Sequence, residues 1–171
     1  ELLDEWSVIE YFKPKPGATG GFYSVGYIVR NKQGRDAFLK AIDLSRADNH
    51  PDPAKETESM LKTFNFEKNL VERCRKKNLS QVVTGLDSGT IRIDGTLVPF
   101  LIFEIAQNDM RSALNFGEQF DLAWTLRLLH SVAKGLEQLH GVDIAHQDLK
   151  PSNILVFRGL ITKLADLGNA A

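Results

Sequence analysis

Acidic, basic and amide side chains lie close together in one short stretch near the end of this 171-residue chain. Asp148, Lys150 and Asn153 fall within six residues, on a segment that Pro151 keeps from forming a helix. A second acid, Asp166, follows a short apolar run. Two acids and one asparagine supply the oxygen ligands that a divalent cation prefers, and a lysine beside an acid suits a phosphate in transfer. The stretch therefore predicts metal-assisted phosphoryl transfer.

The eight residues from 146 to 153 read His-Gln-Asp-Leu-Lys-Pro-Ser-Asn, and this run resembles the catalytic loop of eukaryotic-type protein kinases. The later Asp-Leu-Gly at 166–168 resembles the metal-binding Asp-Phe-Gly of the same family. The resemblance implies that Asp148 orients the attacking hydroxyl group and that Lys150 neutralises the phosphoryl group as it moves.

The same resemblance assigns the metal ligands and part of the nucleotide site. It implies that Asn153 and Asp166 bind Mg²⁺ and that Leu155 lies beneath the adenine of ATP. Gln147 stands where the family often has an arginine that pairs with a phosphorylated activation loop, and glutamine carries no charge. We therefore expect an activity that does not require phosphorylation of that loop.

Glycines cluster earlier in the chain, between residues 17 and 25. This segment resembles a degraded kinase glycine loop, and the resemblance implies that Gly20, Gly21 and Val25 contact the nucleotide. Backbone amides in such a loop bind phosphates only where side chains do not obstruct them. Taken alone, the segment is explained better by a plain turn. It is not a Walker A loop, because no Gly-Lys-Ser/Thr follows.

Lys40 resembles the lysine of the kinase Ala-x-Lys strand, which implies pairing with nucleotide phosphates and with a glutamate on a helix. A solvated lysine is the alternative. Phe38 takes the place of the small residue that lines the adenine site in the family. We choose Glu67 as the partner of Lys40, because the apolar residues after it then fall where the family keeps them. The other glutamates on the same predicted helix are Glu56, Glu58 and Glu72.

The apolar run at residues 100–106 resembles the strand that leads into the kinase hinge. The resemblance implies that Phe103 is the gatekeeper and that Glu104 and Ala106 offer backbone groups to adenine. It also implies that Asp109 reaches a ribose hydroxyl. An ordinary core strand followed by a loop accounts equally well for the apolar residues.

Hydrophobic periodicity predicts the elements that position these residues. The predicted strands and hairpins cover residues 1–12, 23–29, 37–42, 81–86, 91–98 and 100–103. Good helix formers predict a helix over 56–77 after a polar loop at 43–55, with a possible break at 65–66. The leucine repeat over 122–139 predicts the strongest helix, capped by Asp121 and ended by Gly141.

These elements predict an α+β protein, and the resemblance to protein kinases implies a two-lobed kinase-like fold. We expect an N-lobe and hinge over residues 1–106, built on an antiparallel sheet with one main helix. Residues 107–171 are then the start of a helical C-lobe, and polar residues 107–109 form the linker. The apolar stripe on the 122–139 helix calls for partners on more than one side. We therefore expect that these residues alone are not a competent enzyme and need the rest of the C-lobe, from the same chain or from a partner polypeptide.

The composition is that of an ordinary globular protein, with 43% hydrophobic and 25% charged residues. A formal net charge of -1 argues against bulk electrostatic binding to nucleic acid. No apolar run is long enough to span a membrane. The single cysteine, Cys74, excludes an internal disulfide and fits a reducing compartment, so we expect a cytoplasmic protein.

The predicted function is transfer of the ATP γ-phosphate, with Mg²⁺, to a serine or threonine of an unidentified protein substrate. The Lys-Pro-Ser-Asn form of the loop resembles the serine/threonine branch of the family. One alternative is a nucleotide-binding pseudokinase that acts as a scaffold or regulator. Another is a kinase-fold enzyme that phosphorylates a small molecule.

Overall fold

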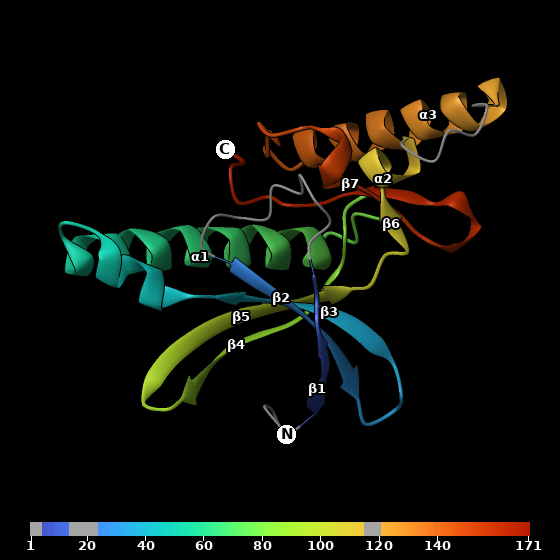
Figure 1. The fold of residues 1–171 in the computed structure, drawn as a ribbon. Helices are drawn as coiled ribbons and strands as arrows, with labels where there is room; N and C mark the ends of the chain where they lie inside the picture. The colour runs from blue at the N-terminus through green and yellow to red at the C-terminus, as the bar shows by residue number, and fades with distance from the viewer. Residues whose placement is uncertain (1–4, 14–23, 115–120) are drawn as a thin grey trace. The chain divides into compact units, whose positions relative to one another are not determined.

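The computed structural model describes residues 5–13, 24–114 and 121–171, and the glycine-rich segment with Gly20 and Gly21 lies outside them (Figure 1). The described residues have the predicted α+β architecture. They divide into two compact units. The first comprises 1–69 and 85–105, and the second comprises 70–84 and 106–171. The lobe boundary between residues 106 and 107 stays a prediction.

The first unit is built on an antiparallel sheet in the order β1-β2-β3-β5-β4. Its strands are β1 (Trp6–Tyr11), β2 (Ser24–Asn31), β3 (Asp36–Ile42), β4 (Gly85–Ile93) and β5 (Thr96–Glu104). Two tight turns set the register. Asn31 accepts backbone hydrogen bonds from Gln33 and Arg35 between β2 and β3. Asp94 and Gly95, both with positive φ, form the predicted hairpin turn between β4 and β5.

The predicted strand over 81–86 is wrong, because β4 begins only at Gly85. The preceding residues pair with a different part of the chain. Val83 donates its backbone N–H to the carbonyl of Leu164, and the N–H of Leu164 donates to the carbonyl of Gln81. Val82 and Leu164 are buried in one core cluster of the second unit. The apolar residues at 82–83 are therefore buried without belonging to the main sheet.

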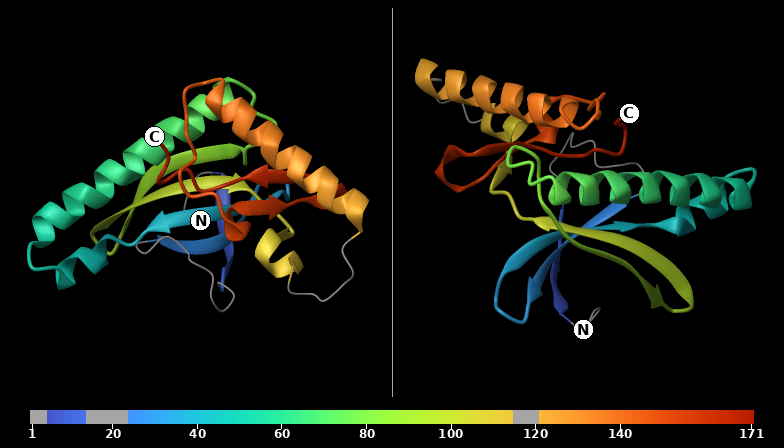
Figure 2. Two further views of the ribbon diagram at one scale, coloured as in Figure 1. Left: turned by 90° about the horizontal axis from the view of Figure 1, so that it is seen from above. Right: turned by 180° about the vertical axis from the view of Figure 1, so that it is seen from behind.

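Helix α1 (Pro53–Lys76) starts earlier than predicted and runs without a break through residues 65–66. Asp52 explains the start, because its side chain accepts a hydrogen bond from the N–H of Lys55 and Pro53 suits the first helical position. The predicted loop before it contains a 3₁₀ helix, η1 (Leu44–Asn49). Met60 and Phe64 of α1 pack in one cluster with residues of β3 and β5, so the helix lies along the sheet (Figure 2).

The sheet of the first unit is strongly curved, and Trp6 joins its two edges. β1 and β4 are the edge strands, yet the Trp6 indole Nε1 donates to Asp87 Oδ2 on β4 over 3.2 Å. Trp6 is buried in the same cluster as Phe100 and Ile102. The β2–β3 and β4–β5 hairpins bend accordingly in Figure 1. This side chain therefore holds together strands that share no backbone hydrogen bonds.

Trp6→Ala is expected to lower the free energy of unfolding of the full-length protein by about 3–5 kcal/mol, as other large buried aromatic truncations do. The substitution removes both the packing of the buried ring and the hydrogen bond to Asp87. Urea denaturation measures the change in the free energy of unfolding. Tyr11→Ala on the same strand is the matched control, because Tyr11 is half exposed. Equal losses for the two variants would contradict a special role for Trp6.

The second unit carries a small sheet in the order β6-β7-β8. Its other elements are α2, α3 and two 3₁₀ helices. In chain order they are β6 (Asn108–Asp109), α2 (Met110–Leu114), α3 (Leu122–His140), η2 (Pro151–Asn153), β7 (Ile154–Val156), η3 (Arg158–Leu160) and β8 (Thr162–Leu164). The predicted linker at 107–109 is therefore partly strand, because Asn108 and Asp109 pair with β7.

Helix α3 confirms the predicted helix and both of its predicted ends. The Asp121 side chain accepts a hydrogen bond from the N–H of Ala123, and Gly141 ends the helix with an ordinary helical φ of -64°. Leu139 is fully buried in the core cluster of the unit. Leu122, Leu126 and Leu129 each expose more than half of their surface within the described structure. Among the described residues, the apolar stripe is therefore covered mainly at its C-terminal end.

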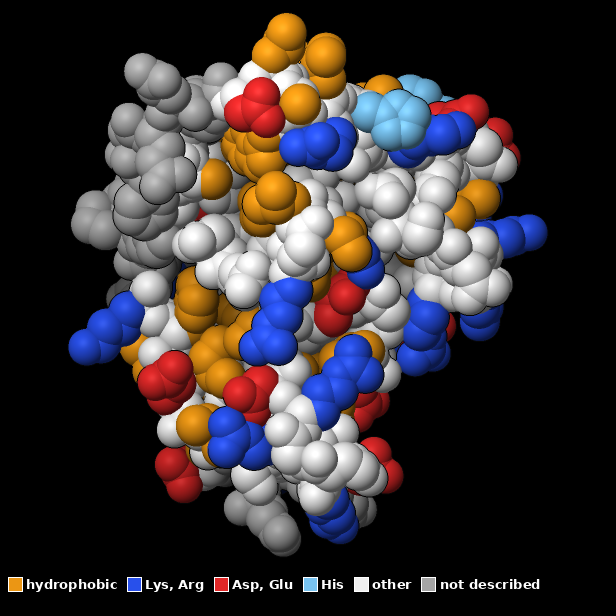
Figure 3. Space-filling model, turned by 90° about the vertical axis from the view of Figure 1, so that its right-hand side faces the viewer, with side chains coloured by type: hydrophobic (Ala, Val, Ile, Leu, Met, Phe, Trp, Pro, Cys, Tyr) orange, Lys and Arg blue, Asp and Glu red, His pale blue; other side chains and the backbone are white. Residues whose placement is uncertain are grey.

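The surface fits the nearly neutral composition. On the face drawn in Figure 3, side chains of both charge signs appear among apolar and uncharged ones. In the part of the chain that the structure describes, no helix is both long and apolar enough to cross a membrane.

Candidate functional site

A buried ion pair joins β3 to α1 in the first unit. Lys40 Nζ lies 2.8 and 2.9 Å from the two carboxylate oxygens of Glu67. The Glu67 side chain is only 5% exposed and that of Lys40 only 16%. Of the glutamates considered from sequence, Glu67 is the one that the structure places against Lys40. Glu58 pairs instead with Lys62 on the exposed side of the helix.

The alternation of β3 explains this contact. Ala37, Leu39 and Ala41 face the sheet core, so Phe38 and Lys40 face the opposite side, toward α1. The antiparallel register with β5 places Phe38 opposite Phe103. The structure thus brings Phe38, Lys40 and Phe103 to one face of the sheet.

Other predicted nucleotide residues of this unit lie elsewhere. Val25 pairs with Ala41, and its register position is on the face opposite to Lys40. Glu104 is the last residue of β5 and pairs with Ala37, again on that other face. The register therefore does not bring Val25 to Lys40.

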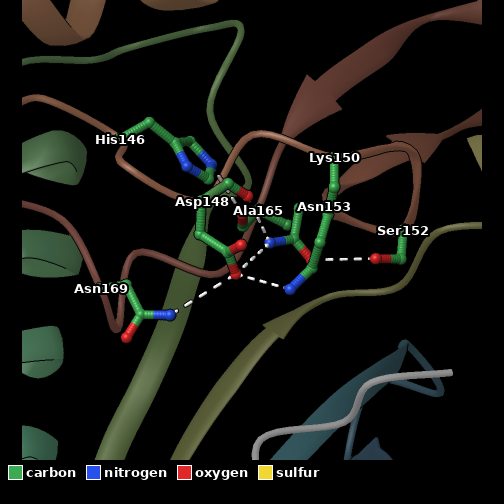
Figure 4. Close-up of polar contacts among 7 residues, drawn as sticks. All are labelled: His146, Asp148, Lys150, Ser152, Asn153, Ala165 and Asn169. Carbon is green, nitrogen blue, oxygen red and sulfur yellow. Dashed lines mark hydrogen bonds and ion pairs between the residues drawn. The ribbon is translucent and has the colours of Figure 1, made fainter.

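In the second unit, three donors converge on one oxygen of Asp148 (Figure 4). Lys150 Nζ lies 2.6 Å from Asp148 Oδ2, Asn153 Nδ2 lies 3.2 Å from it, and Asn169 Nδ2 lies 3.5 Å from it. The hydrogen bond from Lys150 is the main reason why the pKa of Asp148 is held below its usual value. Asp148 is therefore a carboxylate at neutral pH.

Hydrogen bonds tie this loop to the segment after β8 that carries Asp166. Asn153 Nδ2 donates to the carbonyl of Asp148 over 2.9 Å, and the carbonyl of Asn153 accepts from the N–H of Ala165. The carbonyl of Ala165 in turn accepts from His146 Nε2, so this ring nitrogen carries the proton. His146 and Asn153 are both nearly fully buried. Through this contact the buried His146 side chain holds the loop against the segment after β8.

The predicted adenine and ribose residues of the second unit, Leu155 and Asp109, are direct partners across the β6–β7 ladder. The carboxylate of Asp109 accepts a hydrogen bond of 2.7 Å from the N–H of Ser112, at the start of α2. Ala106 is the first residue of this unit's second segment. The structure therefore brings Asp109 and Leu155 together and gives Asp109 a helix-capping contact.

Gln147 holds a strained conformation beside Asp148. Its φ is 57°, and the N–H of Asp148 donates across it to the carbonyl of His146 over 2.8 Å. This is the three-residue γ-turn of positive φ, which is rare and costs energy. Strain of this kind is typical of functional sites, where surrounding contacts hold the backbone in place.

Gln147→Val is expected to lower the free energy of unfolding by about 1–3 kcal/mol, because a β-branched side chain fits positive φ poorly. Gln147→Gly should stay within about 1 kcal/mol of wild type, since glycine adopts this φ without steric cost. Thermal unfolding of the full-length protein measures both. The control is Leu149→Val in the same loop, because Leu149 is half exposed and its φ is not positive. A Gln147→Val protein as stable as Gln147→Gly would contradict the strain.

The donor set fits Mg²⁺ rather than a cation held by protein alone. Among the described residues no group of three or more His, Cys, Asp or Glu side chains gathers for a metal. Asn153 uses its Nδ2 toward Asp148, and its Oδ1 has only a 3.5 Å contact from Ser152 Oγ. Mg²⁺ is typically held by one or two protein ligands together with waters and phosphates. Asn153 and Asp166 would supply such ligands, and the bound ion would neutralise phosphate charge.

Comparison with known proteins decides the family. The sequence profile of the protein kinase domain matches residues 17–171. The chain belongs to the protein kinase domain family. Among relatives, the kinase domain is 33% identical to cyclin-dependent kinase 9 of Danio rerio over 60% of this chain and 25% of that protein. It is 32% identical to cell division control protein 2 homolog 3 of Trypanosoma brucei brucei over 88% of this chain and 44% of that protein. The chain thus spans less than half of these relatives.

Sequence reasoning missed two features of the kinase domain. Asn169 contacts Asp148, although it lies 21 residues away in the chain. Its position directly after Asp-Leu-Gly was the available signal. Gly26 lies against the ring of Phe38, and only the strand register shows that the two residues share a face. Burial raises the pKa of the Cys74 thiol to about 11, so this thiol stays protonated at neutral pH.

Proposed function

We propose that the protein transfers the γ-phosphate of ATP to serine or threonine hydroxyl groups of a protein substrate. The observation that supports this most strongly is the contact pattern at Asp148. Its three side-chain donors all reach Oδ2, and no other residue of the described structure donates a hydrogen bond to Oδ1. Oδ1 is then the oxygen that accepts the proton of the attacking hydroxyl.

The other charged residues have separate proposed roles in nucleotide binding and phosphoryl transfer. Lys40, oriented by Glu67, pairs with the nucleotide phosphates, and Lys150 neutralises the phosphoryl group during transfer. The hydrogen bond between Lys150 and Asp148 holds the two side chains next to each other. Asn153 and Asp166 are the proposed Mg²⁺ ligands. Such a reaction depends mainly on positioning and charge stabilisation.

The nucleotide itself is proposed to contact apolar side chains and backbone groups. Phe103 and Leu155 contact adenine, Glu104 and Ala106 offer it backbone hydrogen bonds, and Asp109 binds a ribose hydroxyl. The glycine loop with Gly20 and Gly21 covers the phosphates. The resemblance to the family supports these assignments.

The serine/threonine preference rests on two supports. The loop reads Lys-Pro-Ser-Asn, and one relative is a probable serine/threonine-protein kinase of Streptomyces coelicolor, 27% identical over 88% of this chain and 21% of that protein. A pseudokinase would lack at least one charged residue of the transfer chemistry. Lys40, Glu67, Asp148 and Asp166 are all present. The cytoplasmic location stays a prediction.

Asp166→Asn is expected to weaken the Mg²⁺-dependent part of ATP binding about tenfold or more and to abolish most phosphoryl transfer, because it removes the proposed charged metal ligand. Fluorescent nucleotide binding with Mg²⁺ or with EDTA measures the first effect, and transfer of radiolabelled phosphate to a protein measures the second. Wild-type protein that binds ATP but transfers no phosphate would support the pseudokinase instead.

A further inference from the structure

Gly26 on β2 lies directly opposite Lys40 in the sheet register, and Ile28 lies opposite Phe38. The four residues therefore share the face of the sheet that meets α1. A Cβ atom added to Gly26 would lie 2.8 Å from Cε2 and 2.9 Å from Cζ of Phe38. The far end of the phenyl ring thus occupies the space that a side chain at position 26 would fill.

Phe12 forms the other wall of this space. Its backbone N–H donates to the carbonyl of Gly26 over 3.0 Å, and its Cβ would lie 3.2 Å from the added Cβ. The rings of Phe12 and Phe38 meet edge to face, with centroids 5.2 Å apart and planes at 81°. Gly26 and Phe12 together form a notch, defined by these two residues, that holds the end of the Phe38 ring.

We propose that Gly26 is a positioning residue of the nucleotide site, because its missing side chain lets the Phe38 ring lie close against β2 instead of standing out from the sheet face that carries Lys40. This inference rests on the proposed function, in which Lys40 pairs with nucleotide phosphates. Phe38 is two residues from Lys40 on the same face, so we expect its ring to lie next to a nucleotide whose phosphates pair with Lys40. The notch explains how this strand carries a phenylalanine whose ring stays close to the sheet.

A methyl group at position 26 should move the ring and leave the strands in place. The two closest atoms that it would meet belong to the free end of the Phe38 side chain, which shifts more easily than backbone, whereas Phe12 Cβ at 3.2 Å needs to yield by only a few tenths of an ångström. Strand side chains have more than one common χ1 value, so the Phe38 ring has another staggered position available. In that position we expect the ring to leave β2 and to stand out from the sheet face that carries Lys40 and Phe103.

Gly26→Ala in the full-length protein is expected to weaken ATP binding about tenfold, as an overpacked site typically does. In a Phe38→Ala background, the same Gly26→Ala change should alter ATP affinity less than about twofold, because no ring is left to displace. Displacement of a fluorescent ATP analogue by ATP measures all four proteins of this double-mutant cycle.

Gly89→Ala is the matched control. A Cβ on Gly89 would lie 2.8 Å from Cζ of Phe100, whose ring is buried on the other face of the same sheet. Gly89→Ala thus repeats the features of Gly26→Ala, a methyl group added in the same sheet close to a phenyl ring, but the displaced ring lies on the face opposite to Lys40. Gly89→Ala should lower the unfolding temperature and leave ATP affinity unchanged when binding is measured well below that temperature.

The Lys40→Met variant distinguishes a failure of the proposed function from a failure of the inference about Gly26. If Lys40→Met binds ATP as tightly as wild type, both the proposed function and this inference are wrong. If Lys40→Met loses affinity while Gly26→Ala does not, only this inference is wrong. An equal loss from Gly26→Ala with and without the Phe38 ring would also overturn it. Should Gly26→Ala fail to fold, Phe38→Trp replaces it, because a larger ring overfills the notch and should weaken ATP binding in the same way.

Discussion

Asp148→Asn is expected to lower the turnover number of the full-length protein by about two to four orders of magnitude, the usual worth of a positioned general base. Asparagine has nearly the same shape, and its amide oxygen can take the place of Asp148 Oδ2 and accept the contacts from Lys150 and Asn153 without the charge. Its amide does not accept a proton from a hydroxyl group. ATP affinity should therefore change little, and the loss should appear in turnover.

Steady-state transfer of radiolabelled phosphate and a separate nucleotide binding assay distinguish the two quantities. Asp143→Asn is the matched control, because Asp143 is exposed in the turn after α3 and lies 3.8 Å from Arg73. Asp143 also has positive φ, which asparagine tolerates. Asp148→Asn protein that transfers phosphate at the wild-type rate would refute the assignment of Asp148 as the base.

Glu67→Gln is expected to lower the free energy of unfolding by about 3 kcal/mol, toward the lower end for breaking a buried ion pair because Lys40 retains some exposure. The substitution leaves the Lys40 ammonium without a charged partner in a mostly buried position. The freed lysine should also be less well oriented toward phosphates. The KM for ATP should therefore rise along with the loss of stability.

Glu58→Gln provides the control for this result. Glu58 and Lys62 form an ion pair of 2.7 Å on the same helix, but both side chains are exposed. Pairs of that kind contribute about 0.3–0.5 kcal/mol. Urea denaturation and ATP titration of the two variants measure the difference. Equal effects of Glu67→Gln and Glu58→Gln on the free energy of unfolding and on the KM for ATP would contradict the larger contribution predicted for the buried pair.

Much of the fold follows from local patterns in the sequence. The 122–139 helix, its Asp121 cap and the Asp-Gly hairpin were predictable, because each depends on residues within a few positions of one another. The errors fall where tertiary contacts compete with local patterns. The apolar residues at 82–83 suggest a strand of the main sheet, but they pair with Leu164 of the second unit.

The contacts of the candidate site show the same difference between local and long-range determinants. The close contacts of the loop follow from local sequence, because Asp148, Lys150 and Asn153 are near neighbours in the chain. Which glutamate meets Lys40 depends on tertiary packing, since that contact spans 27 positions and requires α1 to lie against β3. The physical reason is that helix periodicity fixes which residues share a face, whereas burial against a distant strand decides which face turns inward.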